Sequence, residues 1–289
     1  MVGIIGIVVI FVMVFGGYIA AGGKIGIILH ALPFEMMMIG GAAAGSFLLA
    51  NSGSTVKQAL RDIGKVFKGP GWKPQDYRDV LCLLFELIRI ARANPVALEE
   101  HIERPRESAV FGRYPRILTD HEAIDIICDT LRAGTMNYDD PHQVEEVLDK
   151  RIEAHRHHAL HSSHALQTVA DALPALGIVA AVLGVIKTMA SIDQPPAILG
   201  KMIGGALVGT FLGVFLAYGF FGPFASRVKA VCEEDGNFYS LIREVLVANL
   251  HNHAPNICIE VGRQNTPHHL RPSFSDIETA LRALKQEAA

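Results

Sequence analysis

Four apolar stretches in this chain of 289 residues are each about as long as a helix that crosses a lipid bilayer. A helix needs about 20 apolar residues to cross roughly 30 Å of hydrocarbon. The stretches cover residues 1–21, 33–50, 168–186 and 202–226. Because hydrocarbon cannot hydrogen-bond a bare backbone, and because the stretches lack the alternation of barrel strands, they predict helices. We therefore expect an all-α, polytopic membrane protein with four transmembrane helices.

Charged residues make up only 19% of the chain and are unevenly distributed. Residues 1–23 and 202–226 contain none, whereas residues 52–165 have the composition of a soluble domain. This pattern excludes a disordered chain, a disulfide-rich secreted module and a basic nucleic-acid-binding protein. Membrane lipid is therefore an expected contact, and nucleic acid is not an expected partner.

Basic residues predict the orientation of the chain in the membrane. Of the 26 Lys and Arg residues, 16 lie between the second and third apolar stretches and seven follow residue 226. The positive-inside rule then places this long loop, the tail and both chain ends in the cytoplasm. The expected parts are two helices and a short periplasmic loop (1–51), a cytoplasmic helical domain (52–166), two more helices and a second short periplasmic loop (167–226), and a cytoplasmic helical tail (227–289).

The expected cytoplasmic part reads as helical throughout. Apolar residues recur at helical spacing over 75–94, a short helix is expected over 96–102, and a capping-box sequence begins a further helix at Thr119. A polar, helix-compatible run from Pro141 to His164 is expected to continue into the third span. In the tail, helices are expected near 237–250 and 274–286.

Ionisable side chains are scarce in the spans, and such residues are functional candidates by default. Glu35 and Asp171 each lie near an end of their expected span, so each is either an ion-handling group or an interfacial group in contact with water. No titrating residue is expected at mid-membrane. If this chain moves ions, a partner must supply the central carboxylate.

Prolines and glycines mark where the spans bend and pack. Pro174 in the third span and Pro223 in the fourth each remove a backbone donor, which produces either a structural kink or a flexing point. Gly205, Gly209 and Gly213 let helix backbones approach closely, and Gly41 with Gly45 repeats the same spacing. Packing within the chain and assembly with other chains both remain open.

Metal binding and catalysis have weak support. A histidine run extends from His155 to His164, with His157 and His161 spaced to share a helix face. No converging ligand set accompanies them, so a solvated helix face is favoured, and no metal or cofactor is expected. The chain also lacks H-E-x-x-H, G-x-S-x-G and Walker A sequences, so we do not expect an enzyme.

Several separate segments together resemble one family. The matching segments, in chain order, are residues 15–18, 105–108, 114–118, 171–181, 208–213, 216–223 and 271–274. On these segments the chain resembles the MotA family of flagellar motor stator subunits, within the MotA/TolQ/ExbB proton channel family. The resemblance extends over essentially the whole chain.

The resemblance implies a function and partners. MotA-like chains lie in the bacterial inner membrane and form a pentameric ring around a MotB dimer whose membrane helices carry an Asp. Ion passage at that Asp moves the ring against the rotor protein FliG. Pro174 and Pro223 match the prolines that couple ion transfer to cytoplasmic motion. Arg92 and Glu99 match the rotor-facing charges, with Arg89 as a competing assignment for Arg92.

The resemblance also bears on the coupling ion. Sodium-driven relatives carry Thr where this chain has Ala181 and Gly209, and Thr210 is the remaining hydroxyl there. Because Na⁺ prefers several oxygen ligands, proton coupling is expected. The alternative functions are a TolQ/ExbB-like energiser subunit, which typically has three spans, and a self-sufficient ion channel or transporter.

Overall fold

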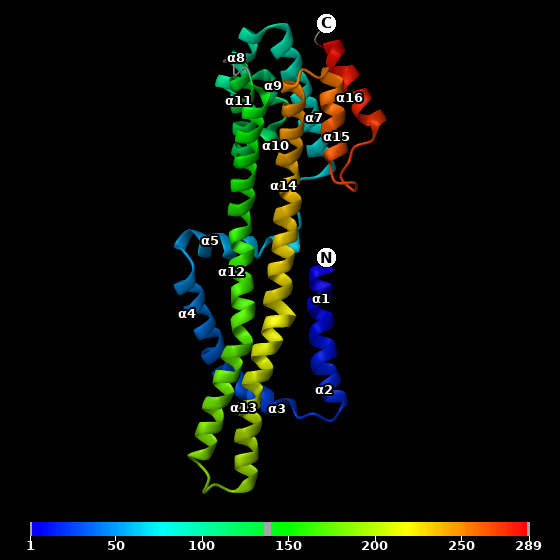
Figure 1. Ribbon diagram of the computed structural model, residues 1–289. Helices are drawn as coiled ribbons and strands as arrows, with labels where there is room; N and C mark the ends of the chain where they lie inside the picture. The colour runs from blue at the N-terminus through cyan, green and yellow to red at the C-terminus, as the bar shows by residue number, and fades with distance from the viewer. Residues whose placement is uncertain (1, 136–139, 288–289) are drawn as a thin grey trace. The chain divides into compact units, whose positions relative to one another are not determined.

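The computed structural model describes residues 2–135 and 140–287, and all its regular elements are helical (Figure 1). The chain divides into two compact units. The first, which we call the membrane unit, comprises residues 1–69 and 159–231, and the second, the globular unit, comprises residues 70–158 and 232–289. Two of the three boundaries between the units lie within long helices, α12 (Pro141–Met189) and α14 (Gly222–Leu250).

Four helical segments are long and apolar enough to cross a membrane, as the sequence predicts: Gly3–Ala20, Ile25–Ala50, Pro141–Met189 and Pro196–Leu250. Single π-helical turns interrupt three of them. The elements of the membrane unit besides α12 and α14 are α1 (Val2–Phe11), η1 (Val12–Gly16), α2 (Gly17–Ala20), α3 (Ile25–Glu35), η2 (Met36–Gly40), α4 (Gly41–Ala50), α5 (Gly53–Asp62), α6 (Lys65–Lys68), α13 (Pro196–Leu216) and η3 (Ala217–Phe221).

The second span differs from its expected bounds. It begins at Ile25 rather than near residue 33, and Pro33 lies inside α3. A membrane helix tolerates such a proline because neighbouring helices and local π adjustments satisfy the freed backbone groups. Glu35 is consequently the last of the 11 residues of α3 within a 26-residue span, and not a group at its outer end.

Glycines bring the third and fourth spans into backbone contact. A methyl group added to Gly177 would lie 2.8 Å from the carbonyl oxygen of Gly209, and one added to Gly213 would lie 2.6 Å from that of Leu173. Such distances leave no room for a side chain, so these glycines pack within the chain. No atom of the described residues lies within 4 Å of a methyl group placed on Gly41 or Gly45.

These contacts predict different outcomes for two otherwise equal substitutions. Gly177→Ala should lower the stability of the detergent-solubilised protein by about 1–3 kcal/mol, because the new methyl group overpacks a backbone contact. Gly41→Ala changes helix propensity by the same amount, but its methyl group meets no described atom, so this variant serves as the control. Thermal unfolding of both variants measures the difference. Equal Tm values would contradict the close packing.

The globular unit is built around α7 (Pro74–Ala93), whose apolar side chains Leu81, Leu84 and Ile88 are fully buried. Its aromatic core includes Trp72, which stacks on Phe238 of α14 with ring centroids 3.8 Å apart. The remaining helices of this unit are α8 (Pro95–Glu103), α9 (Ala109–Gly112), α10 (Pro115–Leu118), α11 (His121–Thr135), α15 (Pro255–Asn265) and α16 (Phe274–Glu287).

Most expected helices of this unit are present with small changes. The polar run from Pro141 continues into the third span as one helix, α12, as predicted. The expected tail helix near 237–250 is instead the end of α14, and α15 was not anticipated. At α11 the cap is Asp120, whose Oδ1 accepts the N–H of Ala123 at 2.9 Å, while the Thr119 hydroxyl donates to the carbonyl of Arg116.

Candidate functional site

The carboxyl group of Glu35 is buried inside the membrane unit. Its side chain is 5% exposed, and Oε2 has no hydrogen-bond partner among the described residues. A methyl group added to Gly209 of α13 would lie 2.5 Å from that oxygen, so the missing side chain of Gly209 makes room for the carboxyl. Burying a carboxyl group without partners costs free energy. Its presence in a span therefore points to function rather than stability.

A hollow of ≈540 Å³ reaches Glu35 between α3, α12 and α13. Charged and polar side chains also line it, namely His30, Lys187, Thr188 and Lys201. Lys187 and Thr188 belong to the last turn of α12, and Lys201 to the start of α13. The hollow therefore connects the region of the α12–α13 turn with the buried carboxyl group.

Of the three expected channel-lining residues, the structure brings Gly209 to the carboxyl group. Gly209 is buried between Glu35 and Ala180, whose Cβ would lie 3.2 Å from a methyl group placed there. Ala181 and Thr210 are half-buried and follow Ala180 and Gly209 in their helices. Since successive helical residues are about 100° apart, they project from other sides of these helices.

The two prolines stand in different local settings. Pro174 lies in the interior of α12, where its missing N–H leaves the carbonyl of Ala170 without an α-helical donor. Pro223 is the second residue of α14, separated from the π-helical turn η3 by Gly222. In that turn Gly222 donates to the carbonyl of Ala217, five residues back. Both positions have a weakened ladder of backbone hydrogen bonds, which is where helices bend.

Arg92, an expected rotor contact, makes hydrogen bonds within the globular unit. Its Nη2 donates to Oδ1 of Asn249 at 3.1 Å and to the carbonyl of His253 at 2.5 Å. These acceptors flank the turn after α14, where Asn252 adopts a positive φ of 61°. Arg92 is therefore exposed but also stabilises this turn.

Arg89 and Glu99 make fewer contacts within the globular unit than Arg92 does. Arg89 lies with its guanidinium carbon 5.7 Å from the centroid of the Phe85 ring, and with Arg92 it lines a hollow of ≈620 Å³. Arg113 also lines this hollow and is paired with Glu86. Glu99 is exposed on α8, a helix whose start is capped by the Asn94 side chain. These residues place charge of both signs on rigid helices.

The two roles of Arg92 lead to a stability prediction. Arg92→Ala should destabilise the protein by about 1–2 kcal/mol, because two charge-assisted hydrogen bonds are lost and partly replaced by water. Glu99→Gln, at an exposed position of the same unit, should leave the unfolding midpoint within about 0.5 kcal/mol of the wild type. Urea or thermal unfolding measures both. An unchanged unfolding midpoint in Arg92→Ala would show that these hydrogen bonds contribute nothing to the stability of the protein.

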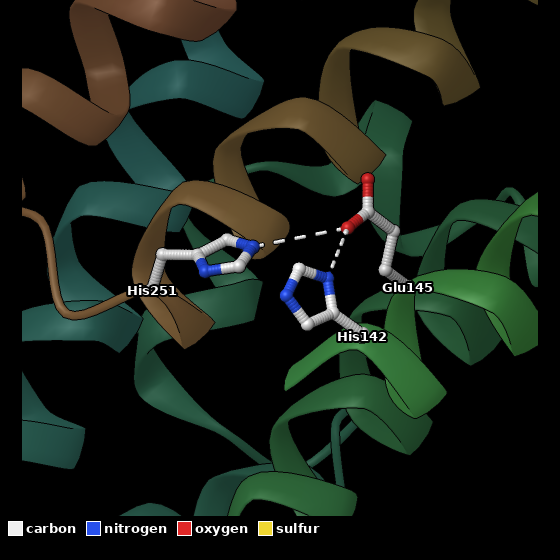
Figure 2. Close-up of side chains that lie close together, drawn as sticks. All are labelled: His142, Glu145 and His251. Atoms are coloured by element: carbon white, nitrogen blue, oxygen red, sulfur yellow. Dashed lines mark ion pairs between the residues drawn. The ribbon is translucent and has the colours of Figure 1, made fainter. Parts of the chain in front are cut away.

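The histidine run does not gather into one site. His155 lies 3.8 Å from Glu122 and packs against the ring of Tyr239, at 4.7 Å between centroids. Burial and the neighbouring Asp120 carboxylate, which accepts the Tyr239 hydroxyl, raise the pKa of that phenol. Among the described residues, a potential metal-ligand group forms elsewhere, at His142, Glu145 and His251 (Figure 2).

Sequence reasoning missed the central position of Glu35 because it started the second span at Pro33. The signal that could have found it is the apolar run from Ile25 to Leu32, which extends the span toward its start. The hydrogen bonds of Arg92 carry no sequence signal, since their acceptors lie about 160 residues further along the chain.

Comparisons with known proteins give consistent matches. A family model described as "Motility protein A N-terminal" matches residues 4–95, and one described as "MotA/TolQ/ExbB proton channel family" matches residues 121–238. Motility protein A of Escherichia coli (strain K12) is 38% identical over 283 residues, which cover 98% of this chain and 95% of the relative. That of Salmonella typhimurium is 39% identical over 286 residues, with the same coverage. The solved structure of C. jejuni MotAB shares the fold, with a TM-score of 0.73, 21% identity, and coverage of 94% of this chain and 98% of that one.

Proposed function

This chain belongs to the motility protein A family, within the MotA/TolQ/ExbB proton channel family, and on that premise we propose how it works as a stator subunit of the bacterial flagellar motor. It is a membrane protein of the inner membrane with four spans. The observation that carries the proposed mechanism is the buried Oε2 atom of Glu35, which lies beside Gly209 and has no hydrogen-bond partner among the described residues. A stator must let an ion pass and turn that passage into force.

The first proposed partner is MotB, because the solved relative is a MotAB complex. MotB would supply the titrating Asp in a membrane helix. Five copies of this chain around a MotB dimer would give the spans partners as well as lipid. Large apolar side chains exposed on the spans suit both kinds of contact; they include Ile4, Ile5, Val8, Leu48, Leu49, Ile178, Val182, Ile186, Ile203 and Leu207.

We propose that the ion is a proton. It would enter the hollow beside Lys187 and Lys201, reach Glu35, and continue to the Asp of MotB. A methyl group placed on Gly209 would lie 2.5 Å from Oε2 of Glu35 and 3.2 Å from Cβ of Ala180, so the residues around this position are small. Ala181 and Gly209 carry no hydroxyl, which leaves Thr210 in this region and Thr188 in the lining of the hollow. Few oxygen ligands favour a proton over Na⁺.

Pro174 and Pro223 would convert the ion step into movement. Each weakens the backbone ladder of one of the two long helices, α12 and α14. Both helices contain residues of the membrane unit and of the globular unit. Bending at the prolines would therefore displace helical residues that belong to the globular unit.

We propose that the globular unit lies in the cytoplasm, as do both chain ends, and that its charges act on the rotor protein FliG. Arg89 and Glu99 are the preferred contacts, because Arg92 already bonds within the unit. Exposed charge pairs are worth about 0–1 kcal/mol each and are screened by salt. Weak contacts of this kind can form and break at every step of a rotating interface.

The stator proposal is tested by deletion and complementation in the source bacterium. Loss of the chain should leave flagella assembled but immobile, and the wild-type chain should restore swimming. Glu99→Lys, at an exposed position, should lower motor torque without lowering the unfolding midpoint, and Arg89→Glu should also lower torque. Glu146→Lys, an exposed reversal on α12, is the matched control and should swim normally.

Two results would refute the proposal. Missing flagella in the deletion strain would indicate an assembly role instead of torque generation. Normal swimming in that strain would indicate another function, such as a TolQ/ExbB-like energiser. The match of residues 4–95 to the motility protein A N-terminal model favours the stator over that energiser.

A further inference from the structure

We propose that His142, Glu145 and His251 bind one divalent transition-metal ion of the zinc type, and that this ion ties the start of α12 to the end of α14 (Figure 2). The proposal goes beyond the stator function and departs from the expectation that the chain holds no metal. It concerns the globular unit, to which all three residues belong.

The three ligand atoms converge on one point. Oε2 of Glu145 lies 3.7 Å from Nδ1 of His142 and 3.8 Å from Nε2 of His251, and all three atoms lie within 4.8 Å of one another. Tetrahedral zinc with ligands at 2.0–2.2 Å places neighbouring ligand atoms about 3.3–3.6 Å apart. Small side-chain rotations would therefore close the site around an ion.

Backbone hydrogen bonds fix the main-chain positions of the two histidines. The N–H of His142, in the first turn of α12, donates to Oδ1 of Asp140 at 3.0 Å. The N–H of His251, directly after α14, donates to the carbonyl of Val247 at 3.0 Å. The rings face one another edge-on, with centroids 5.3 Å apart. The site therefore needs no rearrangement of the main chain.

Arg243 orients the carboxylate of Glu145. Its Nη2 donates to Oε1 of Glu145 at 2.9 Å, which leaves Oε2 directed at the histidines. The same guanidinium lies 2.6 Å from Asp149 and 2.5 Å from Glu244, so three carboxylates share its charge. Hydrogen bonds to the outer oxygen of a ligating carboxylate are a regular feature of metal sites.

The donor set selects the class of metal. Two imidazoles and a carboxylate suit zinc and the later first-row metals, whereas magnesium and calcium prefer oxygen ligands alone. Three protein ligands also leave a fourth position for water. Both histidines are exposed, so an ion can reach the site from solvent. Bound metal would stabilise the globular unit in proportion to the logarithm of its concentration.

The test uses the full chain, purified with its membrane partner, stripped with chelator and placed in non-chelating buffer. Calorimetric titration with ZnCl₂ should give one site per chain, and Zn²⁺ should raise the Tm. Co²⁺ should give the visible absorption of a four-coordinate site. Mg²⁺ should neither bind at this site nor raise the Tm. Absence of stoichiometric Zn²⁺ binding would overturn the proposal.

Variants locate the site. His142→Ala and His251→Ala should each weaken Zn²⁺ binding by at least about 100-fold, since losing even an outer-shell partner costs 10–100-fold. The His142 side chain is 79% exposed, so the metal-free Tm of His142→Ala should match the wild type. His268→Ala, another exposed histidine of this unit, and His157→Ala in the histidine run should bind Zn²⁺ as the wild type does. Wild-type affinity in His142→Ala or His251→Ala, or an equal loss in either control, would contradict the assignment.

Discussion

The backbone contact between the third and fourth spans, made by Gly177 and Gly213, is the constraint on which the membrane unit depends. It draws α12 and α13 so close that no side chain fits between them, and it holds Gly209 opposite Ala180. The carboxyl group of Glu35 occupies space beside Gly209 that any larger residue would fill. Tight helix packing and space for a buried carboxyl group therefore both result from the same row of glycines.

Much of this architecture can be predicted from sequence. Four spans follow from uninterrupted apolar length, and the helices of the globular unit follow from apolar periodicity and capping residues. The bounds of a span are harder to predict, because membrane helices accept proline in their interior. The predicted start of the second span at Pro33 is therefore wrong, and Pro33 lies inside α3. That one displaced bound hid the mid-span position of Glu35.

The candidate site, like the fold, can be predicted from the sequence only in part. The chemical types needed, a carboxyl group and small residues in spans and charges outside them, are visible in the sequence. Contacts between distant residues are not, since the bonds from Arg92 to Asn249 and His253 depend on how α7 packs against α14 and the turn that follows it. The group of His142, Glu145 and His251 likewise needs the packed unit, whereas the conspicuous run from His155 to His164 does not converge.

The central claim is that protons crossing the membrane unit drive rotation, and the rotation speed of tethered cells whose only stators contain this chain tests it most directly. We predict that replacing Na⁺ with K⁺ in the medium leaves the speed unchanged and that a protonophore stops rotation. Glu35→Gln should slow rotation, whereas Gly41→Ala should leave it unchanged. Rotation that stops without Na⁺ and survives the protonophore would contradict the account.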